Sequence, residues 1–191
     1  MNISVTSKEE ILKISRQLVQ QQGWSAVNIR SVASACGVSV GSIYNYFESK
    51  SQLVTATVES VWCDIFHSPQ EVFQNTQECI QWLYQRIKYG KDQYPGFFTL
   101  HSMGFLQQDT ATGREKMQQT WTHIQQSLCS VLYKDPNISP YAFDEQFTRE
   151  KFADLLFSLL LSALLRGDDD PTVVLELVRR TLYNNIRPTS D

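Results

Sequence analysis

Hydrophobic residues recur along most of the chain at the three- and four-residue spacing of amphipathic helices. In the first such segment, Ile11, Ile14, Leu18 and Val19 fall on one face. No stretch alternates apolar and polar residues over the length of a strand, and no Asn-Gly or Asp-Gly pair marks a hairpin. The pattern predicts an all-α protein of about nine helices, three of them short and N-terminal, near residues 7–22, 28–36, 39–47, 49–66, 69–91, 97–108, 112–133, 144–166 and 171–186.

Residues that cap helices stand at several of these boundaries. The first helix opens at Thr6 or Ser7, since each is followed three residues later by a glutamate. Asn28, Ser39 and Ser49 precede the next three helices, and their side-chain oxygens can accept from exposed backbone N–H groups. The N-terminal quarter is therefore predicted to be a run of short, well-delimited helices.

The segment 39–47 has only one narrow apolar stripe, formed by Val40, Ile43 and Phe47. Its other face is small or hydrogen-bonding, with Gly41, Ser42, Asn45 and Tyr46. A helix that packs along one edge and keeps its other face short and polar suits insertion into the major groove of DNA.

The preceding helix has the spacing of a helix-turn-helix. Ala33 is small where a second helix would cross, Gly37 follows four residues later and tolerates positive φ, and Ile43 follows six residues after that as a branched apolar anchor. This spacing predicts a DNA-reading unit, with 39–47 as the recognition helix.

Residues 6–53 resemble the DNA-binding domain of TetR-family transcriptional repressors. The resemblance rests on Gly23-Trp24, on the Asn28 cap and on Gly37-Val38-Ser39-x-Gly41-x-Ile43-Tyr44-x-Tyr46-Phe47-x-x-Lys50-x-x-Leu53. Many members have Thr at the position of Asn28 and His at that of Tyr46, and both replacements here keep a hydrogen-bonding group. Beyond residue 60 the likeness is one of helix number and length.

The resemblance implies two domains: a three-helix DNA-binding domain at 1–50 and an effector-binding and dimerisation domain at 51–191. It also implies a bacterial repressor that binds a pseudo-palindromic operator as a homodimer. A small effector would release it by favouring a dimer with wrongly spaced heads. The helix from Lys50 to Phe66, which would touch both domains, is the expected lever.

The candidate DNA-binding residues divide by chemistry. Side chains that can read bases are Ser42, Asn45 and Val40, since Asn pairs with adenine and Val meets a thymine methyl. Gly41 permits close approach of the backbone. Phosphate contacts are expected from the remaining candidates: Asn28, Arg30, Ser39, Tyr44, Tyr46 and Lys50.

Residues 60–166 are rich in aromatic side chains. By the family resemblance they predict a largely apolar effector pocket, for a flat hydrophobic compound or an organic cation. The candidates are Trp62, Phe66, Trp82, Tyr89, Phe97, Phe98, His101, Phe105, Trp121 and Phe157.

The last two predicted helices carry broad apolar surfaces. In the family such a pair forms a four-helix dimer interface with its mate. The candidates are Phe152, Leu156, Leu159, Leu160, Ala163 and Leu164 on one helix, and Val174, Leu177, Val178, Thr181 and Leu182 on the next.

Charge and cysteine content add little to this picture. The net charge is −3, but residues 1–55 are at +2 and the remainder at −5, which places positive potential on the expected DNA-binding part. The four cysteines are widely spaced without a C-x-x-C pair, and the N-terminus lacks signal-peptide architecture. A cytoplasmic, nucleoid-associated protein is expected. The longest apolar run, Leu155 to Leu165, is too short to span a bilayer.

Two patterns suggest rival chemistry. Gly37-Val-Ser39-Val-Gly41 matches the nucleophile elbow of serine hydrolases, but that elbow requires a strand before it and none is predicted. Cys63 and His67 have a spacing that places two metal ligands on one helix face, yet no second pair accompanies them. No catalytic residue, metal site or cofactor is therefore expected. The alternative function is a helical small-molecule-binding or enzymatic protein whose N-terminal domain is only structural.

Overall fold

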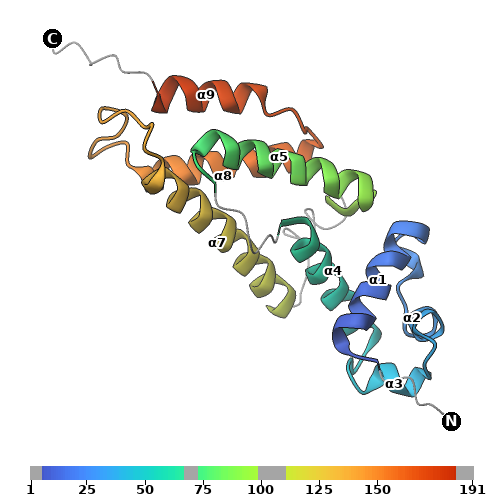
Figure 1. Cartoon of the computed structure of the whole chain (residues 1–191). Helices are drawn as coiled ribbons and strands as arrows, with labels where there is room; N and C mark the ends of the chain where they lie inside the picture. Colours follow the sequence, from blue (N-terminus) through green and yellow to red (C-terminus); the bar gives the residue numbers. More distant parts are fainter. Residues whose placement is uncertain (1–5, 67–72, 99–110, 184–191) are drawn as a thin grey trace. The chain divides into compact units, whose positions relative to one another are not determined.

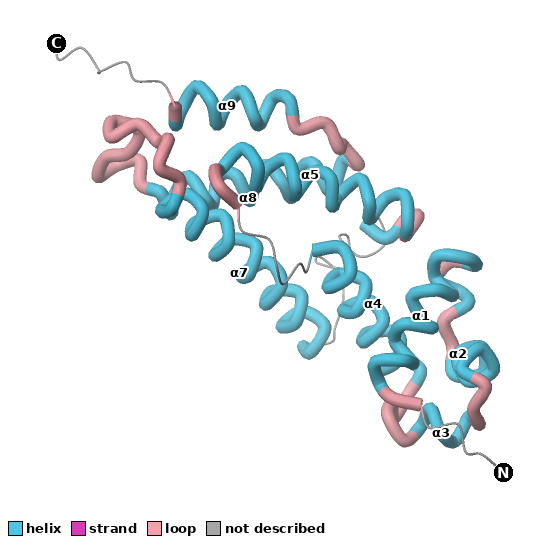
Figure 2. Tube along the Cα trace, in the orientation of Figure 1, coloured by secondary structure: helices cyan, strands magenta, loops and turns pink. Residues whose placement is uncertain are grey.

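The structure, a computed structural model, describes residues 6–66, 73–98 and 111–183, and every regular element in these ranges is helical (Figures 1 and 2). The all-α prediction is confirmed. The elements are α1 (Lys8–Gln22), the 3-10 turn η1 (Trp24–Ala26), α2 (Ile29–Cys36), α3 (Val40–Tyr44), α4 (Lys50–Phe66), α5 (Thr76–Gln93), α7 (Ala111–Lys134), α8 (Arg149–Arg166) and α9 (Thr172–Leu182).

The predicted N-terminal caps are present. Ser7, rather than Thr6, caps α1 and accepts from the N–H of Glu10 at 3.1 Å. Asn28 caps α2, and Ser39 caps α3. The hydroxyl of Ser49 accepts from the N–H of Gln52 at the start of α4. Local side-chain chemistry therefore defines where the first four α-helices begin.

Several predicted helix boundaries were wrong. The third helix ends at Tyr44 rather than Phe47, since Asn45 and Tyr46 already form a turn. The fifth begins at Thr76 rather than Pro69, because Asn75 accepts from the N–H of Glu78 and serves as a cap. The eighth begins at Arg149 rather than 144, with Thr148 as its cap. The predicted helix 97–108 lies outside the described residues beyond Phe98.

The chain forms two compact units. One comprises residues 1–67 and 90–117, and the other comprises 68–89 and 118–191. We call them the head unit and the body unit. The boundary passes through α5, whose last turn belongs to the head unit although its first residues belong to the body unit. The functional division at residue 50 stays a prediction.

The head unit is centred on apolar side chains from α1 to α4. Ile11, Ile43 and Leu53 are fully buried, and Phe47 is almost so. They come from α1, α3, the turn after α3, and α4, so the core joins these elements through side chains that are far apart in sequence. The short helices owe their stability to this shared core rather than to their own length.

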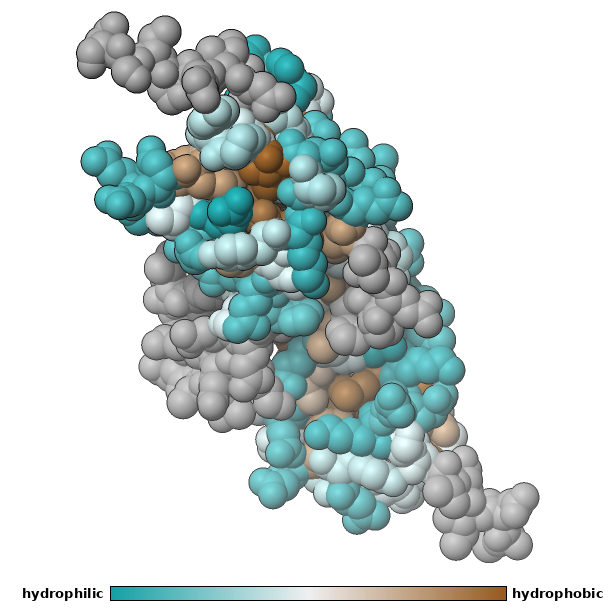
Figure 3. Space-filling model, turned by 60° about the vertical axis from the view of Figure 1, so that its left-hand side comes forward, coloured by the Kyte–Doolittle hydropathy of each residue, from teal (hydrophilic) through white to brown (hydrophobic). Residues whose placement is uncertain are grey.

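The body unit contains α8, α9 and most of α5 and α7 (Figure 1). Helices α7 and α8 meet through the edge-to-face pair Trp121–Phe157, with ring centroids 5.7 Å apart. The exposed surface is mixed, and apolar residues reach it in patches bordered by hydrophilic ones (Figure 3). No helix within the described ranges is long and apolar enough to cross a membrane.

A buried carboxylate ties three helix ends of the body unit together. Asp135, directly after α7, accepts from the N–H and hydroxyl of Thr76 at 2.8 and 2.9 Å, from the hydroxyl of Tyr183 at 2.6 Å and from the N–H of Asn137 at 3.0 Å. Thr76 begins α5 and Tyr183 follows α9. The backbone N–H of Ser139 adds a bond to the carbonyl of Leu182.

These bonds shift two pKa values in opposite directions. Burial alone would raise the pKa of Asp135, but the hydrogen bonds from Tyr183, Thr76 and Asn137 stabilise the carboxylate and the net shift is downward. Burial and the neighbouring carboxylate raise the pKa of Tyr183 to about 12. The folded state therefore favours an ionised Asp135 beside a neutral Tyr183.

We expect Asp135→Asn to lower the free energy of unfolding by about 2–3 kcal/mol, because it weakens several charge-assisted bonds in a buried position. The Asp135 contribution is full above its unfolded pKa of about 4 and is lost as pH falls through the lower folded value. The Tyr183 contribution is full below about pH 10 and is lost as pH rises through about 12. Urea unfolding of Asp135→Asn and Tyr183→Phe across this pH range measures both limits. Exposed Asp154→Asn is the control, and an equal loss in it would contradict the assignment.

Candidate nucleic-acid interface

The crossing of α2 and α3 has helix-turn-helix geometry at the predicted residues. Gly37 has φ +67°, a left-handed conformation that residues with a Cβ rarely adopt. The N–H of Val38 donates to the carbonyl of Ala33 at 3.0 Å, which closes the end of α2. Ala33 and Ile43 are buried. The turn therefore directs α3 away from α2 while Ile43 anchors it to the core.

Helix α3 presents an exposed surface of mixed character. Val40 is 41% exposed and Tyr44 is 51% exposed, whereas Ile43 is fully buried. Val40 was predicted both as part of the inward stripe and as a base-reading residue. The inward part of this prediction was wrong, because the five-residue helix turns only Ile43 fully into the core. Gly41 and Asn45 are exposed as well, and Ser42 is half-buried.

The capping residues are engaged within the protein. Asn28 accepts from the N–H groups of Arg30 and Ser31, and its amide donates to the hydroxyl of Ser31 at 2.8 Å. Ser39 accepts from the N–H of Ser42 at 3.1 Å, and the two hydroxyls lie 2.9 Å apart. These side chains hold the helix starts in place, and a phosphate contact from them would be additional to this role.

Two cations and one phenol of the predicted set have no partner among the described residues. Lys50, the first residue of α4, and Arg30, in the first turn of α2, are exposed and make no ion pair there. The Tyr44 hydroxyl donates to no acceptor in the described ranges. Free cations beside exposed backbone N–H groups are the arrangement that binds phosphate.

Tyr46 differs from Tyr44. Its hydroxyl donates to the backbone carbonyl of Thr6 at 2.5 Å, which ties the turn after α3 to the residue before the α1 cap. The ammonium of Lys8 lies 5.7 Å from the centroid of the Phe47 ring and reinforces the same junction. Sequence reasoning missed this contact because 40 residues separate its partners and neither belongs to a recognisable local motif.

The predicted effector-binding residues fall into both units. Trp62, Phe66, Phe97 and Phe98 come together in the head unit, where the Trp62 ring centroid is 5.7, 5.0 and 5.8 Å from those of the three phenylalanines. The others described belong to the body unit: Trp82, Tyr89, Trp121 and Phe157. His101 and Phe105 lie outside the described residues. The complete pocket stays a prediction.

One polar atom of the head-unit cluster is unsatisfied. The indole N–H of Trp62 is buried, with the side chain only 3% exposed, and it has no hydrogen-bond acceptor within the described part of the chain. A buried donor without an acceptor costs free energy that a bound acceptor would recover.

Most of the predicted dimer residues belong to the core of the body unit. Eight are buried in the single chain: Phe152, Leu156, Leu160, Ala163, Leu164, Val174, Val178 and Leu182. Leu159, Leu177 and Thr181 are half-buried. The large apolar side chains exposed on α8 and α9 are instead Leu155, Leu165 and Val173, at 42, 60 and 79%.

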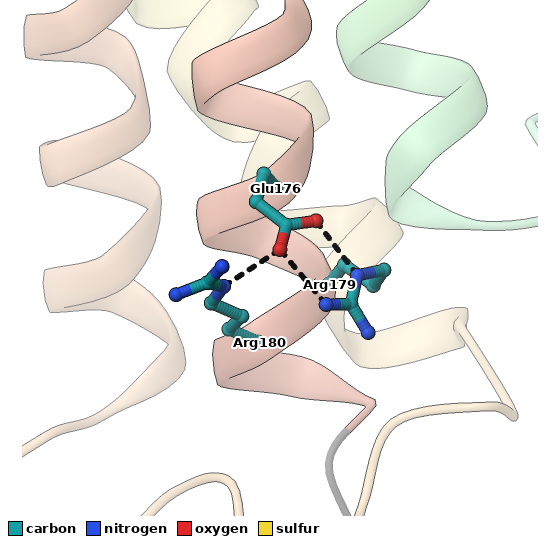
Figure 4. A network of polar contacts seen from close by, with 3 residues as sticks. All are labelled: Glu176, Arg179 and Arg180. Carbon is teal, nitrogen blue, oxygen red and sulfur yellow. Dashed lines mark hydrogen bonds and ion pairs between the residues drawn. The ribbon is translucent and has the colours of Figure 1, made fainter.

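Helix α9 also carries an internally paired charge cluster (Figure 4). Glu176 accepts from Nε of Arg179 at 2.7 Å and from Nε of Arg180 at 2.6 Å. These bonds lower the pKa of Glu176 to about 2. The carboxylate therefore stays ionised and holds both guanidinium groups along one side of the helix.

The rival chemical sites gain no support. Ser39, the serine of the hydrolase-like motif, caps α3, and no strand enters it from the described residues. Cys63 is exposed, and His67 lies outside the described residues. No group of three potential metal ligands gathers among the side chains that the structure describes.

Comparison with known proteins supports the helix-turn-helix reading of this surface. Residues 11–57 match the sequence model of "Bacterial regulatory proteins, tetR family". An uncharacterized HTH-type transcriptional regulator, YerO of Bacillus subtilis, is 40% identical over 52 residues, or 27% of this chain and 18% of YerO. The HTH-type transcriptional repressor KstR2 of Rhodococcus jostii is 31% identical over 65 residues, or 34% of this chain and 32% of KstR2. The matches thus span less than a third of either relative.

Solved structures extend the likeness to the fold of nearly the whole chain. A transcriptional regulator from Rhodococcus sp. Rha1 superposes with a TM-score of 0.63 at 15% identity, covering 96% of this chain and all of that one. FadR from Bacillus subtilis, solved in complex with stearoyl-CoA, superposes with a TM-score of 0.57 at 13% identity, covering 95% of this chain and all of FadR.

The helix-turn-helix at α2–α3, the family match across it and the shared all-helical fold agree with one another. Residues 11–57 therefore form a domain of the tetR family of bacterial regulatory proteins, and nearly the whole chain has the fold of solved transcriptional regulators.

Proposed function

We propose that this regulator is a repressor that binds a pseudo-palindromic operator as a homodimer and is released by a small apolar or aromatic effector. The exposed face of α3 carries this proposal, since Val40 and Tyr44 project from a helix that Ile43 anchors in the core. Arg30 and Lys50 lie in the first turns of α2 and α4, with no ion-pair partner among the described residues. In this assignment residues 1–50 read DNA, and residues 51–191 bind the effector and dimerise.

The roles of the surface residues follow from their contacts. Asn45 and Ser42 read base edges, and Val40 meets a methyl group. Tyr44, Lys50 and Arg30 bind phosphate oxygens, since their polar ends have no partner in the described part of the head. Tyr46 chiefly positions the start of α1, because its hydroxyl already donates to the Thr6 carbonyl.

Substitutions on this face should separate these roles once an operator has been selected from a random DNA pool. We expect Lys50→Ala to weaken binding to all sequences and to reduce the salt dependence of log Kd by about one unit of slope. Asn45→Ala should cost about 1–3 kcal/mol and relax the preference at one operator position. Fluorescence anisotropy across a salt series measures both effects.

Exposed residues of the body unit supply matched controls. Lys134→Ala and Tyr141→Ala should bind the operator as the parent does, because both residues lie outside the proposed surface. Unchanged affinity in both Lys50→Ala and Tyr44→Ala would show that the face is wrongly assigned. Binding by the parent that does not weaken with salt would argue against DNA binding altogether.

The dimer is supported by the exposed apolar residues of α8 and α9. Leu165 and Val173 are 60 and 79% exposed, and such side chains are costly to leave in water on neighbouring helices. The cluster of Glu176, Arg179 and Arg180 borders Val173 on α9 and suits the polar rim of an interface. Eight of the residues predicted for the dimer interface are buried in the core of the body unit instead.

Charged substitutions test this surface. We expect the double variant Leu165→Glu, Val173→Glu to sediment as a monomer, since like charges would be buried in a two-fold interface. Its operator affinity should fall because a single head makes half the contacts. Sedimentation equilibrium measures the first effect. Tyr133→Glu, equally exposed on α7, is the control, and a double variant that stays dimeric would place the interface elsewhere.

The effector proposal is supported by the aromatic cluster around Trp62. Its rings provide an apolar wall, and the buried Trp62 N–H provides a hydrogen-bond donor without an acceptor in the described part of the chain. FadR binds stearoyl-CoA on a similar fold, which is consistent with a largely apolar ligand. A neutral, flat molecule with one acceptor atom fits these groups best.

Naphthalene and quinoline form a matched pair of probes, since the rings have the same shape and only quinoline has an acceptor nitrogen. We expect the parent to bind quinoline about 2–10 times more tightly than naphthalene, the worth of one neutral hydrogen bond. Trp62→Phe should abolish this difference while still binding naphthalene. Fluorescence quenching of the remaining tryptophans measures both affinities. A preference for quinoline that persists in Trp62→Phe would exclude the indole as the donor.

A further inference from the structure

The ring of Phe97 lies between two tryptophans of the head unit. It stacks on Trp24 of η1 with centroids 5.6 Å apart and planes at 18°, and it meets Trp62 of α4 at 5.0 Å and 59°. Phe97 is fully buried. One side chain therefore contacts both the turn that leads into the helix-turn-helix and the helix that follows it.

A polar contact chain joins the same elements. The hydroxyl of Tyr94 donates to Asp64 of α4 at 2.9 Å, and the guanidinium of Arg16 on α1 lies 3.9 Å from the other oxygen of that carboxylate. Arg16 also donates to the hydroxyl of Ser60. Residues 94–97 thus hold α4 by an aromatic and a polar contact, and through α4 they reach α1.

The segment that makes these contacts follows directly after α5. The N–H of Tyr94 donates to the carbonyl of Gly90 in its last turn, and the N–H of Phe97 donates to that of Tyr94. At Gly90 an added Cβ would lie 2.6 Å from the Phe98 ring and 2.9 Å from Ile65 of α4. The absence of a side chain at Gly90 lets α5 seat closely against the cluster.

We propose that Phe97, clamped between Trp24 and Trp62, is the positioning residue that sets the angle of the helix-turn-helix on α4. We call these three residues the Phe97 clamp. All three residues belong to the head unit, so the clamp acts within that unit. The effect of Phe97 on DNA binding rests on the proposed repressor function. Its effect on the position of the helix-turn-helix relative to α4 does not.

Half-site spacing distinguishes positioning from simple stability. One base pair inserted at the operator centre moves the two half-sites about 3.4 Å further apart. A parent with fixed heads should discriminate against this operator, and Phe97→Leu should narrow the ratio of the two affinities by a factor of about 2 to 12, the worth of one aromatic pair. A merely structural role would weaken both operators equally and leave the ratio unchanged, which would overturn the proposal.

Two variants complete the design. Phe143→Leu removes a ring that packs on Phe147 and Phe152 in the body unit, and it should leave the ratio at the parent value. An equal narrowing in this control would also overturn the proposal. If Phe97→Leu does not fold, Tyr94→Phe decides the matter, since it removes only the bond to Asp64. A decrease in the affinity ratio that is smaller than the one expected for Phe97→Leu supports the proposal. An affinity ratio equal to that of the parent overturns the proposal.

Hydrogen exchange without DNA separates failure of the clamp from failure of the proposed function. In Phe97→Leu the amides of residues 29–44 should exchange faster than in the parent and in Phe143→Leu. This result in a protein that binds no DNA would refute the repressor function and keep the clamp. Exchange identical to the parent in this region would refute the clamp.

Discussion

Burial of Ile43 and Phe47 is the constraint on which the exposed surface of the head depends. Helix α3 has five residues, far too few to be stable alone in water. It exists because Gly37 turns the chain at positive φ and Ile43 then enters the core beside α2. Only with these two side chains fixed inside do Val40, Tyr44 and Asn45 face outward together, so the exposed face of this segment depends on the packing of its buried face.

The features predicted well from the sequence are those that depend on interactions between residues close together in the chain. Ser7, Asn28 and Ser39 each satisfy nearby backbone N–H groups, and Gly37 meets a conformational need that few residues can meet. The helix starts that were wrong, at Pro69 and residue 144, show the limit of this reasoning, since Asn75 and Thr148 compete as caps in the same stretch. Where several residues in one stretch can cap a helix, tertiary packing decides at which of them the helix begins.

Contacts between residues far apart in the chain could not be predicted from the sequence. Periodicity identified the apolar faces of α8 and α9, yet it could not show that Leu156, Leu160 and Val178 are already covered within one chain. The pairs Tyr46–Thr6 and Tyr94–Asp64 join residues 40 and 30 positions apart. Nothing in the sequence around either residue of a pair indicates its partner. Only the folded structure shows that these two hydrogen bonds join distant parts of the head unit.

The stack of Trp24 on Phe97 has a consequence for recombination among regulators. A chimera that joined residues 1–50 to the remainder of a relative would keep α1, α2 and α3 but leave Trp24 facing a foreign side chain. The natural unit of exchange is discontinuous, because part of it lies after α5. An exchange that kept the packing around Trp24 intact would have to carry Phe97 along with the N-terminal helices.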